Sequence, residues 1–421
     1  MSQPVPRTVS IDAMADAFRP GERLYFPGSA GEPRALMTAL AARPERSRGL
    51  RILSSAVPGI NRLALDELDP SVEVTGLFMQ PGLRQAQREG RFRHLPLSFA
   101  GFVDHVRERV AIDTCVVHVA PPDAAGRCSL GAAVEFTPLV QARSARTFAL
   151  INPNMPAIPG AQTLPMSAFD RVCEVETPLP TYDVGAPGAS AIVIAGHIAR
   201  LIEDGSALQA GLGKVPEALY ALLHDRRGLR LQSGMFSDGA LQLSRSGALD
   251  PNFHHASCVW VGSADLYGDL AGLEHLSVLS CDITHNVCRL ASTDRFVAVN
   301  SALSVDLFGQ ANLELAGGRA VSGVGGAPDF ANAARLSHGG ISIVALPAVY
   351  GSTPRSRIVP RMDDGIVSLP RQAIDVVITE HGIADLRGRT VFERAEALMA
   401  IAAPAFQADL EAAWNIIKQQ L

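Results

Sequence analysis

The chain has 421 residues, more than a single domain usually contains, so two domains are expected. Its 37 basic and 42 acidic side chains give a formal charge of −5, which offers no reason to expect nucleic acid or an anionic membrane as a partner. A soluble cytoplasmic protein is expected instead, because the six cysteines show no disulfide spacing, the N-terminus lacks a signal pattern, and no apolar run approaches the ~20 residues of a membrane span.

The first half of the chain shows the pattern of an α/β domain. A glycine-bearing turn, PGSAGEP, leads into a helical pattern. The strands predicted in this half are short runs of low charge that are rich in β-branched or aliphatic residues. These runs are 50–56, 72–78, 114–120, 147–152 and 171–176. Their burial on both faces predicts a parallel sheet. The Pro-, Gly- and Ser-rich segment 177–190 predicts a linker near residue 185, and hence domains 1–185 and 186–421.

The second half opens with the stretch that we expect to carry the function, residues 211–239. An apolar run at 207–210 is followed by the turn GLGKVP, a helical pattern, and a second strand predicted over 229–236. This order of elements is the unit from which parallel sheets are built. Glycines at such a turn admit a ligand close to the backbone, and a helix N-terminus favours an anion. Tight strand-to-helix packing would select the same glycines.

The two halves are similar to each other around these turns. Residues 18–24 align with 202–208, and a glycine turn follows in each case. After one residue of insertion, Pro33-Arg34-Ala35-Leu36 aligns with Pro216-Glu217-Ala218-Leu219. This agreement suggests a duplicated α/β domain.

The rest of the second half continues the α/β pattern. Strands are predicted at 258–262, 276–280, 296–300, 341–345 and 373–379, before a helical tail over 392–421 that Pro404 interrupts. The run AGGRAVSGVGGAPDF at 316–330 is unusually rich in glycine, which indicates close approach to a ligand or to a neighbouring strand. Because it lacks the ending of a P-loop and the Rossmann spacing, ATP and NAD are not expected.

Several motifs resemble segments of the acetyl-CoA hydrolase/transferase family, which includes the 4-hydroxybutyrate and acetate CoA-transferases of family I. They are VNSALSVDLFGQ, SGVGGAPDFANAARLSHGG, SRIVP and TEHGIADLRG in the second half, and GEP, HVAPPDAAGRCSLG and NPNMP in the first. The resemblance implies two similar α/β domains of the CoA-transferase type with the active site between them. It also implies coenzyme A as a substrate, with an acyl-CoA and a small carboxylate or other acyl acceptor as partners. A homo-oligomer is left open.

The sequence departs from this family at the nucleophile. Family members form an anhydride and then a glutamyl-CoA thioester on a glutamate that ends a His-Thr/Ser-Glu triplet. The matching residues here are Gln232-Ser233-Gly234, and a glycine can form neither intermediate. Two more polar positions differ, because Ser304 replaces an acidic residue and Ile341 replaces an expected lysine. The resemblance therefore implies a CoA-thioester enzyme that works without the usual nucleophile.

The candidate catalytic residues each have a functional and a structural interpretation. Glu32 is the most attractive substitute carboxylate, although the helix dipole alone favours a glutamate beside a helix N-terminus. Ser233 is a nucleophile without a G-x-S-x-G elbow, or an ordinary strand-end serine. Asp238 is a general base or a turn residue, and Glu135 is interpreted as structural. The cluster of cysteine, aspartate and histidine at 281–288 lacks a fourth ligand and tight pairing, so no metal is expected.

The glycine-rich turns are expected to bind CoA and the developing oxyanion through backbone amides. The residues assigned to CoA binding are Gly211, Leu212, Gly213, Lys214, Val215, Gly323, Gly325, Gly326, Asp329 and Phe330, and the substrate-pocket wall is assigned to Asn300 and Ser301. Three functions stay open: a hydrolase or acyltransferase in which the acceptor attacks directly, a catalytically silent acyl-CoA binding protein, and a standard transferase with its nucleophile elsewhere. We favour the first, because both glycine turns and TEHGIADLRG are retained.

Overall fold

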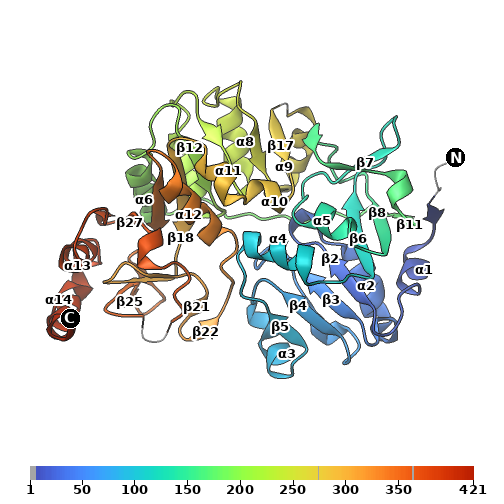
Figure 1. Ribbon diagram of the computed structural model, residues 1–421, viewed down its shortest axis with the longest axis horizontal. Helices are drawn as coiled ribbons and strands as arrows, with labels where there is room; N and C mark the ends of the chain where they lie inside the picture. Colours follow the sequence, from blue (N-terminus) through green and yellow to red (C-terminus); the bar gives the residue numbers. More distant parts are fainter. Residues whose placement is uncertain (1–5, 274, 363–364) are drawn as a thin grey trace. The chain divides into compact units, whose positions relative to one another are not determined.

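The computed structural model describes residues 6–273, 275–362 and 365–421. The chain separates into two compact units, which we call unit 1 (Met1–Asp183 with His254–Thr284) and unit 2 (Val184–Phe253 with His285–Leu421). Strands and helices alternate along the chain in each of them (Figure 1). Unit 1 thus contains the segment 254–284 from the second half of the chain. The prediction of two contiguous domains, 1–185 and 186–421, assigned this segment to the second domain.

Unit 1 is organised around an eight-stranded sheet in which all neighbouring strands run parallel. Its central strand β6 is buried along its whole length, as expected of a strand covered on both faces. Each run predicted as a strand in the first half overlaps a strand of this sheet, so the prediction of a parallel sheet is confirmed. In spatial order the strands are β1 (Arg7–Thr8), β11 (Arg171–Glu174), β8 (Arg146–Ile151), β6 (Thr114–Val119), β2 (Arg23–Phe26), β3 (Arg51–Ser54), β4 (Glu73–Gly76) and β5 (Phe92–His94).

The segment 254–284 pairs with unit 1 through its strands. β15 (His255–Ser257) pairs in parallel with β17 (Leu276–Val278), which pairs in turn with β9 (Gly160–Ala161). A separate antiparallel pair joins β7 (Arg127–Ser129) to β10 (Thr163–Pro165). Unit 1 also contains, among other elements, η1 (Ser29–Gly31), α1 (Ile11–Ala15), α2 (Arg34–Ala42), α3 (Arg84–Arg88), α4 (Phe99–Glu108), α5 (Thr137–Gln141), β16 (Val259–Trp260), α9 (Ala264–Asp269) and α10 (Cys281–Thr284).

Unit 2 contains a six-stranded sheet that is parallel except at one edge, where β28 runs antiparallel to β27. In spatial order its strands are β13 (Arg230–Leu231), β12 (Ala207–Ala210), β18 (Phe296–Ser301), β23 (Ile341–Ala345), β27 (Val376–Thr379) and β28 (Gly382–Asp385). The strand predicted over 229–236 is wrong as a single element. It is divided into β13 and β14 (Met235–Phe236), because pairing with β12 ends at Leu231 and leaves Gln232 to Gly234 between the two strands.

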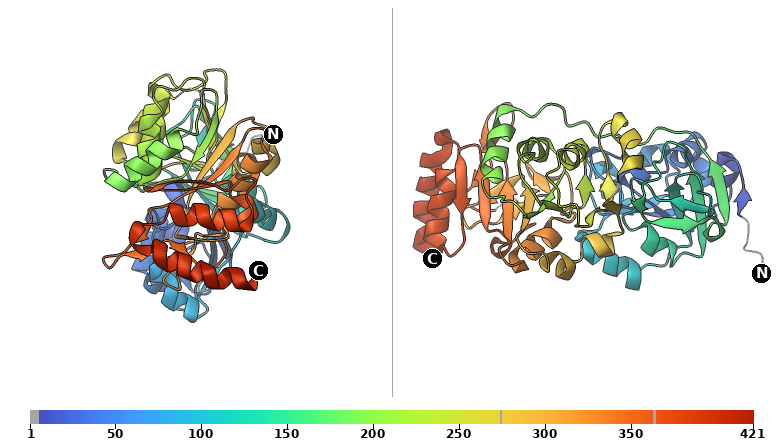
Figure 2. Two further views of the ribbon diagram at one scale, coloured as in Figure 1. Left: turned by 90° about the vertical axis from the view of Figure 1, so that its left-hand side faces the viewer. Right: turned by 90° about the horizontal axis from the view of Figure 1, so that it is seen from above.

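Helices and short strands complete unit 2. The predicted helical tail is confirmed as α13 (Val391–Ala400) and α14 (Pro404–Ile417), which lie side by side (Figure 2) and share an apolar core with β27 through Leu398, Trp414 and Val377. The other elements are α6 (Ala189–Ala199), α7 (Lys214–Leu222), α8 (Asp238–Arg245), α11 (Val287–Ala291), α12 (Ala327–Leu336), β19 (Ser304–Asp306), β20 (Ala311–Asn312), β21 (Leu315–Ala316), β22 (Arg319–Ala320), β24 (Val349–Tyr350), β25 (Arg355–Ser356) and β26 (Ile358–Val359). Among the described residues, no helix combines the length and the apolar character needed to cross a membrane.

The two sheets repeat the same neighbourhood around the glycine turns. β2 lies between β6 and β3, with β8 beyond β6, whereas β12 lies between β18 and β13, with β23 beyond β18. A helix follows the turn after each of these strands, α2 after β2 and α7 after β12. The structure therefore has two similar α/β units, as the duplication in the sequence suggests.

Candidate active site

The turn between β12 and α7 begins a helix whose first turn has no side-chain cap. Gly213 is the N-cap and has φ +129°, a conformation that only glycine adopts readily. Residues 211–215 are half-buried or exposed. These features suit the predicted role of Gly211, Leu212, Gly213, Lys214 and Val215 in CoA binding, which stays a prediction.

Gly234, the predicted position of the family nucleophile, lies between β13 and β14. Ser233 is buried there, and its hydroxyl donates to the carbonyl oxygen of Ala210 at 2.8 Å. A Cβ atom added at Gly234 would lie 3.1 Å from Nε2 of His285 and 3.6 Å from Cε2 of Phe330. The backbone of Gly234 is outside the left-handed region, so it is the neighbouring imidazole, and not the backbone, that limits a larger side chain here.

His285 is the centre of this part of unit 2, and the sequence analysis considered it only within a rejected metal cluster. Its ring lies 4.7 Å from that of Phe330, and a Cβ atom at Gly326 would lie 2.5 Å from its Cδ2. Burial lowers the pKa of His285 to about 3, so the imidazole is neutral at physiological pH. The structure thus brings Gly234, Gly326 and Phe330 together around one histidine. No spacing in the sequence indicates this, because residues 234 and 285 meet only through the fold.

Two amide side chains on neighbouring strands of unit 2 have atoms without a hydrogen-bond partner among the described residues. They are Nδ2 of Asn300 on β18 and Oε1 of Gln209 on β12, and both are buried. An unpaired buried donor or acceptor is costly, so its presence points to a ligand or water that completes the pairing. Asn300 was predicted as a pocket wall, whereas Gln209 was missed because glutamine within an apolar strand gives no motif. Ser301, the other predicted wall residue, is exposed.

Glu217 is a second residue that the sequence analysis did not single out. It lies in the first turn of α7, and its carboxylate accepts a hydrogen bond from the Ser237 hydroxyl. Burial raises the pKa of Glu217, and the nearby charge of Asp238 acts in the same direction. Asp238 itself is the first residue of α8. The predicted base Asp238 is therefore accompanied by a second half-buried carboxylate.

The second glycine-rich run of unit 2 leads into α12. Gly325 has φ +56°, and Gly326 is the N-cap of the helix. Asp329 and Phe330 are buried in its first turns. The assignment of this run, Gly323 included, to CoA binding stays a prediction.

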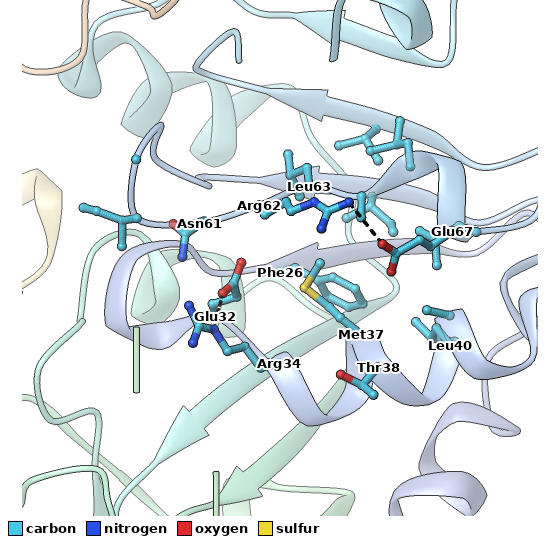
Figure 3. Close-up of a pocket in the computed structure, with 18 residues that line it drawn as sticks. Phe26, Glu32, Arg34, Met37, Thr38, Leu40, Asn61, Arg62, Leu63 and Glu67 are labelled. Carbon is cyan, nitrogen blue, oxygen red and sulfur yellow. Dashed lines mark hydrogen bonds and ion pairs between the residues drawn. The ribbon is translucent and has the colours of Figure 1, made fainter. Parts of the chain in front are cut away.

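In unit 1, Glu32 lies in a pocket of about 580 Å³ between α2 and the loop 59–68 (Figure 3). Its Oε2 accepts a hydrogen bond from Nε of Arg34 at 2.8 Å, and Arg62 pairs with Glu67 at 3.2 Å elsewhere on the pocket wall. Burial raises the pKa of Glu32, and its pairing with Arg34 opposes that rise. The remaining wall is mainly apolar, with Phe26, Met37, Leu40, Ile52, Leu63, Leu65 and Val74.

Glu135 holds the unit 1 turn in place. Its carboxylate accepts hydrogen bonds from the hydroxyls of Ser29 and Ser55, both at 2.6 Å. Ser29 and Glu135 have φ of +49° and +44°, which is strained for residues other than glycine. These contacts support the structural interpretation of Glu135.

The thiols of the 281–288 cluster differ in environment. Cys281 is buried beside Cys258, and burial raises its pKa, whereas Cys288 is exposed. The expectation that the protein holds no metal stays a prediction.

Both halves of the chain match known protein domains. Residues 4–180 match the acetyl-CoA hydrolase/transferase N-terminal domain, and residues 262–414 match the C-terminal domain. The chain is 32% identical over 396 residues to 4-hydroxybutyrate coenzyme A transferase from Clostridium kluyveri, with 92% of each chain covered. It is 24% identical over 447 residues to an acetyl-CoA hydrolase from Eremothecium gossypii, covering 91% of this chain and 84% of the hydrolase. Among solved structures, RipA from Yersinia pestis is similar at a TM-score of 0.91 and 27% identity, with 98% of each chain covered.

Proposed function

The chain belongs to the acetyl-CoA hydrolase/transferase family, and from this premise we propose that it hydrolyses an acyl-CoA by direct attack of water, without a glutamyl-CoA intermediate. Coenzyme A enters as part of the substrate and leaves as a product. We further propose that the reaction takes place in the cytoplasm and uses no resident metal.

The geometry around position 234 carries the proposal. The glycine has no group that forms an acyl anhydride, and the imidazole of His285 lies next to the space that a side chain would enter. A neutral imidazole accepts a hydrogen bond from water, but with a pKa of about 3 it is too weak a base to keep the proton. We therefore propose that His285 positions the water and that a carboxylate accepts the proton that the water loses.

Two carboxylates are candidates for this base, Glu32 in unit 1 and Glu217 in unit 2. Burial raises both pKa values toward the pH at which the enzyme works, which makes a carboxylate a better acceptor of a proton from water. We assign the role first to Glu217, because it lies in unit 2 together with His285 and belongs to the first turn of the helix that follows the glycine turn.

The proposed reaction balances without any further reactant. The oxygen of water bonds to the thioester carbon while the carboxylate takes up one proton. The carbon–sulfur bond then breaks, and the CoA thiolate receives that proton as the free acid leaves. Nδ2 of Asn300 and the amides of the glycine turns are the donors that we assign to the developing oxyanion.

A test measures the release of free thiol from butyryl-CoA in the absence of any carboxylate. The wild type is expected to turn over, and Glu217→Gln to lower kcat by about 100-fold or more, as the loss of a general base does. Glu203→Gln, which changes an exposed glutamate of the same unit, is the matched control. No thiol release by the wild type would contradict direct hydrolysis and leave either the silent binding protein or a transferase that needs a carboxylate acceptor. An unchanged kcat in Glu217→Gln would exclude Glu217 as the base and leave Glu32 as the other candidate.

The name of the 32% identical relative favours a second candidate, a transferase that passes CoA to a carboxylate. In that case, the wild type would exchange labelled acetate into acetyl-CoA by a ping-pong mechanism. Such exchange would contradict direct hydrolysis and would require a nucleophile other than residue 234.

A further inference from the structure

A pocket of about 300 Å³ lies at the amino-terminal edge of the large sheet in unit 1. It is lined by Arg23, Arg51 and Glu73, the first residues of β2, β3 and β4, and by Arg93 of β5. These four strands are neighbours in the sheet (Figure 1). The glycine turn of unit 1 follows the other, carboxyl end of β2. The pocket therefore belongs to unit 1 alone and is separate from that turn.

The strand register places two like charges next to each other in this pocket. Arg23 is the Cα partner of Arg51, and Arg51 is the partner of Glu73. Paired residues point to the same face of a sheet, and like charges at such positions destabilise the strand pair. Glu73 is engaged elsewhere, because its Oε2 pairs with Nη2 of Arg93 at 3.1 Å. Within the described part of the chain, neither Arg23 nor Arg51 forms an ion pair.

The other acidic side chains at this edge of the sheet also have partners of their own. Glu22 pairs with Arg146. Oδ2 of Asp113 accepts a hydrogen bond from the backbone N–H of Arg23 at 2.8 Å, and Asp113 does not line the pocket. Among the described residues that do line it, Glu73 is the one carboxylate against three arginines. Such an excess of positive charge is unexpected in a chain with a net charge of −5.

Helix α4 and the segment after it contribute a further part of the wall. His105 of α4 and Thr75 of β4 each supply a polar group, and residues 110–112 are mainly apolar. Burial lowers the pKa of His105, and the positive charge of Arg109 acts in the same direction. The influence of a fourth arginine thus reaches a residue of the pocket wall. A ligand in the pocket would find positive charge and hydrogen-bond donors on several elements.

We propose that this pocket binds a small oxyanion of the phosphate type. A tetrahedral anion presents oxygen atoms in several directions, and guanidinium groups bind phosphate oxygens through pairs of hydrogen bonds. A monocarboxylate is a poorer match, because one guanidinium satisfies both of its oxygens. The volume of about 300 Å³ lies at the lower end of the range for small-molecule pockets, which suits a free anion better than a nucleotide. Such binding does not depend on the proposed hydrolysis.

The first test is calorimetric titration with inorganic diphosphate at neutral pH and one fixed low salt concentration. Saturable binding is expected for the wild type, and Arg23→Gln and Arg51→Gln are each expected to weaken it by about ten-fold, because each loses a charge-assisted hydrogen bond. Arg88→Gln, which changes an exposed arginine of α3 outside the pocket, is the matched control. Unchanged affinity in both pocket variants would overturn the proposal. Equal weakening by Arg88→Gln would show only a general attraction of charge and would overturn it as well.

The second test seeks a gain of binding, which a damaged fold cannot produce. Glu73→Gln removes the one carboxylate among the described lining residues and releases Arg93, so it is expected to tighten diphosphate binding by about ten-fold. Unchanged or weaker binding in this variant would contradict the role assigned to the charge of the pocket.

ADP, titrated in the same way, distinguishes a free anion from a nucleotide. It is expected to bind no more tightly than diphosphate. If ADP binds ten-fold more tightly than diphosphate to the wild type and loses this advantage in Arg51→Gln, the pocket takes a nucleotide, and the assignment to a free anion is overturned.

Discussion

The glycine turns of the two units follow equivalent strands but have opposite surroundings. In unit 1, residues 28–32 are all buried, and the carboxylate of Glu135 holds the turn through Ser29 and Ser55. In unit 2, residues 211–215 are half-buried or exposed and have no side-chain cap. The same scaffold thus provides one buried, braced turn and one turn that is more accessible and lacks a side-chain cap. The difference is consistent with the proposal that the unit 2 turn binds a ligand.

The largest effect that would test this contrast is expected from Glu135→Ala. The substitution leaves the hydroxyls of Ser29 and Ser55 buried without their acceptor, at a cost of about 3 kcal/mol of unfolding free energy. Glu135→Gln keeps an acceptor oxygen and is expected to cost less. Urea unfolding of both variants measures the difference, with exposed Glu45→Ala as the control. A change below about 0.5 kcal/mol in Glu135→Ala would mean that the turn is not braced in this way.

A smaller loss of stability is expected from a substitution at Gly234 in unit 2. Gly234→Glu must displace His285, so it is expected to cost about 1–3 kcal/mol through overpacking. His285→Ala makes room, and the double variant is expected to recover stability and to gain CoA exchange between acetyl-CoA and a free carboxylate. Unfolding and exchange assays on the two single variants and the double variant form a complete cycle. Additive stability effects would show that the two positions do not compete for the same space.

The two units are also expected to differ in the sign of their pH dependence. Burial raises the pKa of Glu135 above 4.5, so its contribution to stability is present below pH 4.5 and is lost as the pH rises through the raised value. Burial lowers the pKa of His285 from 6.5 to about 3, so its contribution is present above pH 6.5 and is lost as the pH falls. The free energy of unfolding, measured between about pH 4 and 8, should fall less steeply than in the wild type toward high pH in Glu135→Gln and toward low pH in His285→Ala. The same slopes in all three proteins would contradict the assignment.

Much of the fold could be predicted from the sequence, because the sheet strands are short apolar runs between turn residues. The segment 254–284 could not, since β17 pairs with β9 more than 100 residues earlier and no periodicity encodes that partner. At the site, the motifs predicted Gly234 as the position of the family nucleophile, which stays a prediction, and the imidazole beside it was missed. His285 acquires its role from packing against Phe330 and Gly326, which depends on the folded unit 2.

The central claim is that water, and not an enzyme carboxylate, attacks the thioester. A single turnover of acyl-CoA in oxygen-18 water tests it directly, with mass spectrometry of the released acid and of the enzyme's peptides. Direct attack predicts one oxygen-18 atom in the acid and none in any glutamate or aspartate of the protein. An acid that carries ordinary oxygen, together with oxygen-18 in one carboxylate of the enzyme, would show that a covalent relay operates and would contradict the account.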